Sequence, residues 1–277
     1  MAKGTGLIGN FKGKVGNTVG YKLSASNNGQ TQGIRVYQPI VKNPKTSAQA
    51  EQRAKLAPIN ATYRALKMII DRGNEGLPYG NKSRLAWLKK AFKSAEMPWF
   101  VKGATVIKPV GVQLTKGSLA GLVFSNTDNG IEIICSSVTN ETAVNTVGAI
   151  STALKAGYPT LKDGDQVTFV VAGQASGALI AKVFSFMIDT TSTEALTGFS
   201  ASSGTILYLD DDVYEGGAVI ISREGANGEH LRSTTVLKLA SSVTVDAPYD
   251  ATSKEAAIES YMNSAAANSD WAEESIQ

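Results

Sequence analysis

The spacing of hydrophobic residues along this 277-residue chain changes near residue 110. Before that point, two segments place apolar residues three and four positions apart, which is typical of amphipathic helices. After it, short apolar runs alternate with Gly, Asn and Asp, which is typical of antiparallel strands joined by turns. The pattern therefore predicts an α+β protein in which helices precede a β-rich part.

The first helical segment opens with Thr46 and Gln49, which form a capping-box pattern. Pro58 interrupts the segment, and proline removes a helix hydrogen bond and clashes with the preceding turn. We therefore expect either a kink or two helices, over about 47–56 and 58–72. One face of the segment is apolar, through Leu56, Ile59, Tyr63, Leu66 and Ile70.

A second helix is predicted over about residues 83–96. We expect Leu85, Leu88 and Phe92 to face the core. The opposite face is basic and is expected to lie in solvent, with the residues Arg84, Lys89, Lys90 and Lys93.

The segment before the helices is rich in glycine and β-branched residues and predicts a β-hairpin over 13–41, with Asn28-Gly29 at its tip. It would form a basic arm carrying Lys12, Lys14, Lys22 and Arg35. Gly4, Gly6 and Gly9 match the G-x-G-x-x-G pattern of dinucleotide-binding turns, which requires a helix directly after it. Further glycines occupy that stretch and disfavour a helix, so we expect tight turns and no nucleotide site.

Eight apolar runs follow residue 110, and we interpret them as an antiparallel β-sandwich of immunoglobulin-like type, with a helix inserted near 143–156. The chain ends in an Ala-rich acidic helix. The expected domains are a basic hairpin-and-helix domain (1–110), a β-sandwich domain (111–245) and an acidic helical tail (246–277).

Basic and acidic residues are unevenly distributed along the chain. Residues 1–110 hold 19 Lys and Arg against four acidic residues, and the rest holds eight basic and 20 acidic residues. Such asymmetry favours a nucleic-acid or acidic partner, or a contact in which the basic half of one copy meets the acidic half of the next. Alternatively, the two halves pack on each other within one monomer.

The residues that carry most enzyme chemistry are scarce. The one histidine, His230, follows a probable turn and is expected at an exposed strand edge, while Cys135 lies in an apolar run and is expected to be buried. No Cys or His pair has zinc-ligand spacing. The acidic run of Asp210, Asp211 and Asp212, with Glu215, is interpreted as an exposed turn, with calcium binding as the alternative. We expect neither an enzyme nor a cofactor.

Neither a membrane-spanning run nor a secretory signal is evident, so we expect a protein that is cytoplasmic as synthesised, or part of a virion or extracellular assembly. The N-terminal sequence resembles an uncharacterised family of bacterial and phage-associated proteins. In that family a G-K-V-G-x-x-V-G segment leads to an Arg-containing strand, a proline and a T-x-x-Q-x-x-Q-R helix. The resemblance implies no activity, cofactor or catalytic residue. Its matched positions are Gly13, Lys14, Val15, Gly16, Val19, Gly20, Arg35, Pro44, Thr46, Gln49, Gln52 and Arg53.

These observations favour a non-enzymatic structural protein that self-assembles, as in virions, phage tails or filaments, with itself or other assembly proteins as partners. Asp210, Asp211, Asp212 and Glu215 are the candidate receiving patch. The alternative is a nucleic-acid-binding protein that contacts the phosphate backbone through its basic half. Its aromatics Tyr21, Tyr37, Tyr79 and Trp87 would stack on bases. The candidate basic contact residues are Lys12, Lys14, Arg35, Arg53, Arg84, Lys89, Lys90 and Lys93.

Overall fold

The computed structural model divides the chain into two compact units, residues 1–45 and 46–277. The helices that follow residue 46 therefore pack with the β-rich part, whereas the sequence predicted that they share a domain with the basic strands. Mixed α+β architecture is confirmed, with helices and several antiparallel sheets. The structure describes residues 13–22, 32–37, 46–93, 99–103, 113–175, 178–209, 214–226, 228–240 and 251–263.

The first unit holds a three-stranded antiparallel sheet in the order β1-β2-β3, rather than the two strands of a simple hairpin. The turn between β1 and β2 contains Gly16, whose φ of 56° lies in the left-handed region that glycine adopts readily. The predicted tip at Asn28-Gly29 lies outside the described residues. The strands are β1 (Gly13–Val15), β2 (Thr18–Lys22) and β3 (Gln32–Val36).

The second unit begins with helix α1 (Ser47–Ala65), and its predicted cap is confirmed because Thr46 Oγ1 accepts a hydrogen bond from Gln49 N at 3.3 Å. The prediction of two helices separated at Pro58 was wrong, since α1 continues through that residue. Pro58 and Ile59 are buried, and α1 packs against both α5 and β8. This packing offsets the cost of about 3 kcal/mol that proline imposes inside a helix.

The helical break comes at Leu66, after which α2 (Lys67–Ile70) is a single turn and α3 (Asn81–Ala91) follows a loop. The predicted inward face of α3 was partly wrong. Trp87 is only 2% exposed, whereas Leu85 is 56% exposed. The Trp87 ring lies 6.2 Å from that of Tyr63 on α1, so contact with α1 selects the face that is buried.

Two larger sheets form the β-rich part, and all eight predicted runs contain at least part of a strand. One sheet has the order β5-β6-β10-β9, and the other β12-β11-β7-β8 with β14 beside β11. Short β4 and β13 pair separately. The strands are β4 (Gln113–Thr115), β5 (Phe124–Thr127), β6 (Gly130–Ile134), β7 (Gln166–Ala175), β8 (Ala178–Met187), β9 (Phe199–Ser202), β10 (Thr205–Tyr208), β11 (Gly216–Glu224), β12 (His230–Arg232), β13 (Thr235–Val236) and β14 (Lys238–Leu239).

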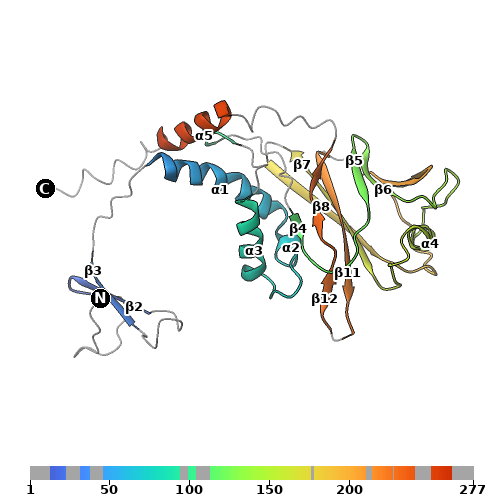
Figure 1. Cartoon of the computed structure of the whole chain (residues 1–277), viewed down its shortest axis with the longest axis horizontal. Helices are drawn as coiled ribbons and strands as arrows, with labels where there is room; N and C mark the ends of the chain where they lie inside the picture. Colours follow the sequence, from blue (N-terminus) through green and yellow to red (C-terminus); the bar gives the residue numbers. More distant parts are fainter. Residues whose placement is uncertain are drawn as a thin grey trace. The chain divides into compact units, whose positions relative to one another are not determined.

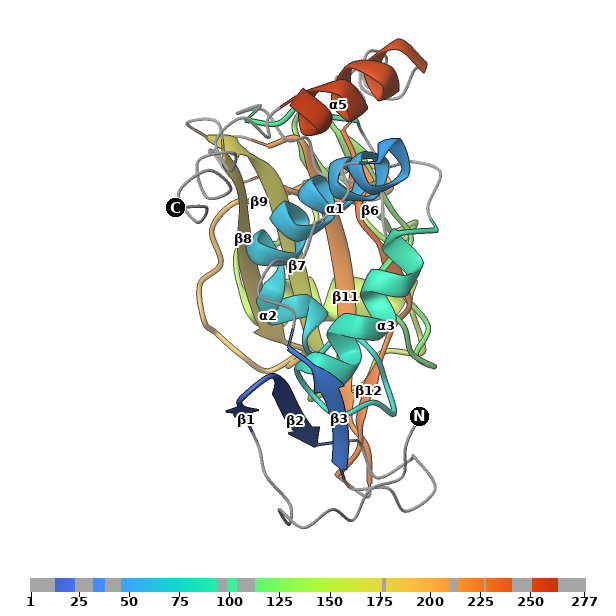
Figure 2. The same ribbon diagram turned by 90° about the vertical axis from the view of Figure 1, so that its left-hand side faces the viewer.

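Helices α1, α2 and α3 lie on one side of the β12-β11-β7-β8 sheet, and β5 and β6 lie on its other side (Figures 1 and 2). The two sheets meet through an aromatic cluster centred on Phe169, which is fully buried. Its ring centroid lies 4.8 Å from Tyr208 and 5.3 Å from Phe199, both from the other sheet. Phe184 and Phe186 of β8 complete the cluster.

Two further helices flank these layers. α4 (Val147–Gly157) confirms the helix predicted near 143–156 and is capped by Thr146, whose Oγ1 accepts from Ala149 N at 3.2 Å. α5 (Ala251–Asn263) is the predicted C-terminal helix and packs along α1 (Figure 1). No helix in the described ranges has the length and apolarity needed to cross a membrane.

Glu75, in the loop before α3, ties the helices to the sheet. Its Oε2 accepts hydrogen bonds from Ser118 N at 2.9 Å and Arg232 N at 3.1 Å, and its Oε1 accepts one from Ser118 Oγ at 2.8 Å. Burial acts to raise the pKa of Glu75, but these hydrogen bonds outweigh it and hold the pKa below its ordinary value of 4.5. The ionised carboxylate therefore stabilises the fold.

We expect Glu75→Gln to lower the free energy of unfolding at pH 7 by about 1–2 kcal/mol, because charge-assisted hydrogen bonds are lost. A depressed pKa gives stability that is present at neutral pH and disappears as the pH falls through the native pKa. The gap between wild type and variant should therefore close below pH 4.5, as measured by urea unfolding. A gap that stays constant with pH would contradict this role for the Glu75 charge.

Candidate assembly surface

Strand β8 is the candidate surface because it is long and forms an edge of its sheet. It spans Ala178–Met187 and pairs with β7 along its whole length, from Gln166 with Met187 to Ala175 with Ala178. Within the described residues, no other strand pairs with it. One edge of β8 thus has no partner strand there, and such edges can pair with another chain.

The register shows which backbone groups of β8 face this edge. Ile188 N donates to Asp165 O at 2.7 Å, directly after the last ladder pair. Hydrogen-bonded and non-hydrogen-bonded pairs alternate in an antiparallel ladder. Even-numbered residues of β8 therefore bond to β7, while odd-numbered residues, including Val183, direct their N–H and C=O groups away from it.

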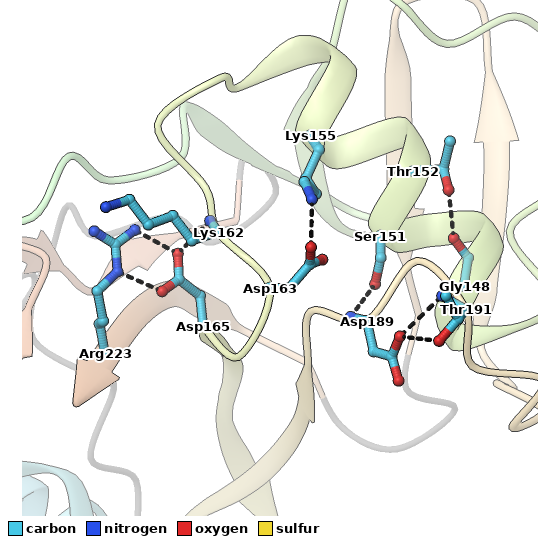
Figure 3. Close-up of polar contacts among 10 residues, drawn as sticks. All are labelled: Gly148, Ser151, Thr152, Lys155, Lys162, Asp163, Asp165, Asp189, Thr191 and Arg223. Carbon is cyan, nitrogen blue, oxygen red and sulfur yellow. Dashed lines mark hydrogen bonds and ion pairs between the residues drawn. The ribbon is translucent and has the colours of Figure 1, made fainter. Parts of the chain in front are cut away.

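A network of polar contacts fixes the end of β8 (Figure 3). Asp165, at the start of β7, is 1% exposed and accepts hydrogen bonds from Arg223 Nε at 2.5 Å and Nη2 at 2.7 Å. On the other side, Asp189 N donates to Ser151 Oγ of α4 at 3.1 Å, and the Asp189 carboxylate accepts from Thr191. The C-terminal end of β8 is therefore held by the start of β7 on one side and by α4 on the other.

The side chains of β8 alternate between the core and the surface. Phe184 and Phe186 join the aromatic cluster between the sheets, whereas Val183 is 47% exposed and Met187 59% exposed. The sequence predicted a strand here from its apolar residues. It gave no signal that the strand lies at an edge, since the strand order depends on contacts far apart in the chain.

The three-stranded sheet of the first unit presents basic side chains. Lys14 and Arg35 are exposed, and Lys14 Nζ lies 3.7 Å from the centre of the Tyr37 ring. Within the described residues, β1 and β3 are the two edges of this sheet. Lys12, also predicted as a contact residue, lies outside the described residues.

The basic helical residues do not form the uniformly exposed face that was predicted. Lys89, Lys93 and Arg53 are exposed. The predictions for two others were wrong. Arg84 lies with its guanidinium carbon 4.6 Å from the Tyr63 ring centre, and Lys90 Nζ donates to Gln113 Oε1 at 2.7 Å. Burial, together with Lys116, lowers the pKa of Lys90, so its ammonium group is not a freely solvated contact.

The predicted acidic patch is only partly described. Asp210, Asp211 and Asp212 lie outside the described residues. Glu215 is half-buried, and its backbone is tied to the sheet because its N–H donates to Ala172 O at 3.0 Å and its C=O accepts from Ala240 N at 2.9 Å. The position of Glu215 is therefore fixed by the sheet, unlike that of a residue in a free exposed turn.

The two residues considered for catalysis lie where the sequence predicted. Cys135 is 1% exposed, with its Sγ 3.1 Å from Ser137 Oγ. His230 is exposed at the start of edge strand β12. Among the residues that the structure describes, no group of three or more His, Cys, Asp or Glu side chains could hold a metal ion.

The chain matches no protein-family model, no curated protein and no solved structure.

Proposed function

We propose that this protein is a non-enzymatic structural protein that self-assembles, as a component of a virion, phage tail or filament. The observation that carries the proposal is the edge of β8 on which no strand among the described residues pairs. In the proposed contact, the small basic sheet of one copy adds a strand to β8 of the next copy. Main-chain hydrogen bonds give the affinity in such strand addition.

The charges of the two units support a contact between copies. Residues 1–45 contain seven basic residues and no acidic one, whereas residues 46–277 contain 20 basic and 24 acidic residues. Their net charges of +7 and −4 attract each other. The first unit of one copy and the second unit of another present different surfaces, so their contact is heterologous and builds rings or filaments.

The β8 side chains fit a strand-addition site better than a solvent-facing edge. Natural edge strands are commonly short or carry several charges that prevent association. β8 has ten residues, and Lys182 is the only charged residue in it. We further propose that the β-rich part is a sandwich of immunoglobulin-like type, the class its eight apolar runs favour.

We expect Val183→Pro to abolish assembly while leaving the fold intact. The Val183 N–H points away from β7, so proline removes no bond of the native ladder but takes a donor from the free edge. Val183→Thr is the matched control, because it keeps the N–H and a β-branched side chain. The measurement is light scattering with negative-stain imaging of the full chain at low salt.

Wild type and Val183→Thr should form rings, tubes or filaments that dissociate at high salt. Val183→Pro should stay monomeric. Circular dichroism verifies that the variant is folded. Should Val183→Pro fail to fold, Val183→Lys tests the same edge by adding a charge. The proposal is wrong if wild type stays monomeric at every salt concentration, or if a folded edge variant assembles like wild type.

A further inference from the structure

A polar cleft lies at the end of the sheet where β7 and β12 begin and β8 and β11 end. Its volume is about 320 Å³, at the lower end of the sizes common for small-molecule sites. The loop between α2 and α3 forms the wall opposite the strands. The lining residues used below are Arg72, Tyr79, Arg223, Glu224, His230 and Arg232.

Three flat groups follow one another in this cleft, two from the loop and one from β12. The guanidinium carbon of Arg72 lies 5.5 Å from the centre of the Tyr79 ring. The Tyr79 ring in turn lies 5.7 Å from the His230 ring, tilted by 35°. Tyr79 is 51% exposed, so much of its surface is accessible to a further planar group. Exposed aromatic rings of this kind stack on nucleic-acid bases.

Arginines surround these rings and are held in place. Arg223 is fixed by Asp165, and its Nη2 also donates to Thr160 O at 2.9 Å. Arg232 is positioned through its backbone, since its N–H donates to Glu75 and its C=O accepts from Leu119 N at 2.9 Å. Guanidinium groups suit phosphate, because their planar donors match its oxygens.

The charge balance of the cleft favours an anion. Its lining holds three guanidinium groups and a single carboxylate, that of Glu224. Asp165 neutralises Arg223 from beneath. Once the carboxylates of Glu224 and Asp165 are both counted, the three guanidinium groups leave a net charge of +1 beside the exposed Tyr79 ring.

We propose that this cleft binds a nucleoside phosphate, with the phosphate on Arg72 and Arg232 and the base against Tyr79 and His230. The ligand is a free nucleotide or one unit of a single-stranded nucleic acid, which share this chemistry. The proposal does not rest on assembly through β8: strand addition uses the long side of β8, whereas the cleft lies at the ends of the strands, where only Met187 of β8 lines it.

The test uses the full chain and fluorescence anisotropy of a labelled twelve-residue oligothymidylate. Arg72→Gln and Tyr79→Ala should each weaken binding roughly tenfold, while Tyr79→Phe, which keeps the ring, should bind like wild type. The matched control is Lys67→Gln, which removes one positive charge from an exposed site outside the cleft and should weaken binding less than twofold. Arg72→Gln should also reduce the slope of log affinity against log salt by about 0.7.

Competitors distinguish the two sources of the ligand. Displacement of the probe by adenosine monophosphate at micromolar concentration identifies a free-nucleotide site, and displacement only by unlabelled oligonucleotide identifies a nucleic-acid site. Repeating the titrations in the Val183→Pro background separates binding from assembly. The proposal is overturned if Lys67→Gln weakens binding as much as Arg72→Gln, if Tyr79→Ala has no effect, or if wild type binds neither probe nor competitor.

Discussion

Replacing Phe169 by alanine should lower the free energy of unfolding by about 3–5 kcal/mol, because it leaves a cavity at a fully buried site. Phe169 contacts aromatic residues of both sheets, so the cavity separates side chains that hold the sheets together. Neighbours at 4.8 Å and 5.3 Å on the other sheet cannot fill the space without moving their strands. Urea unfolding followed by far-UV circular dichroism measures the loss.

The matched control is Met68→Ala, which also truncates a large apolar side chain but at a site that is 79% exposed. It should change the free energy of unfolding by no more than about 0.5 kcal/mol. A Phe169→Ala variant as stable as the control would mean that the two sheets do not depend on the aromatic cluster.

Replacing Asp165 by alanine is the second change with a large expected effect. It removes the carboxylate bonded to Arg223 and to Lys162 N, and leaves Arg223, whose side chain is 21% exposed, without its charge partner. Breaking a fully buried ion pair costs about 3–5 kcal/mol. Partial exposure of Arg223 lowers our expectation to about 2–3 kcal/mol.

A double-mutant cycle tests this explanation. In the combination of Asp165→Ala with Arg223→Met, no guanidinium is left unpaired, so the double variant should be more stable than the sum of the single changes predicts. Additive effects would assign the loss at Asp165 to its hydrogen bond with Lys162 N and to local packing rather than to the ion pair.

Local sequence signals predicted the elements well where neighbouring residues determine them. The Thr46 cap and the helix near 143–156 both depend on short-range backbone geometry. The burial of Cys135 likewise followed from its place in an apolar run.

The features that the sequence did not predict depend on contacts between distant segments. Helix α1 passes through Pro58 because α5 and β8 pack against it. Trp87 rather than Leu85 faces inward because of its contact with Tyr63. The cleft at Arg72 and Arg232 joins residues 160 positions apart, so no local pattern could indicate it.

The structure also changes where the charge contrast lies. The sequence placed the boundary near residue 110, but the basic helices beyond residue 46 belong to the same unit as all of the acidic residues. The alternative that the two halves pack on each other within a monomer is therefore consistent with the single compact unit that residues 46–277 form. The contrast that remains for a contact between copies is that between residues 1–45 and 46–277.

Hydrogen–deuterium exchange of residues 178–187 tests strand addition at β8 most directly. The peptide is compared in assembled wild type at low salt and in the same protein dissociated at high salt, with Val183→Pro in both buffers as the control for salt. Strand addition predicts slower exchange of the odd-numbered amides of β8 only in assembled wild type, because they gain hydrogen bonds. Equal exchange in the assembled and dissociated protein would contradict it.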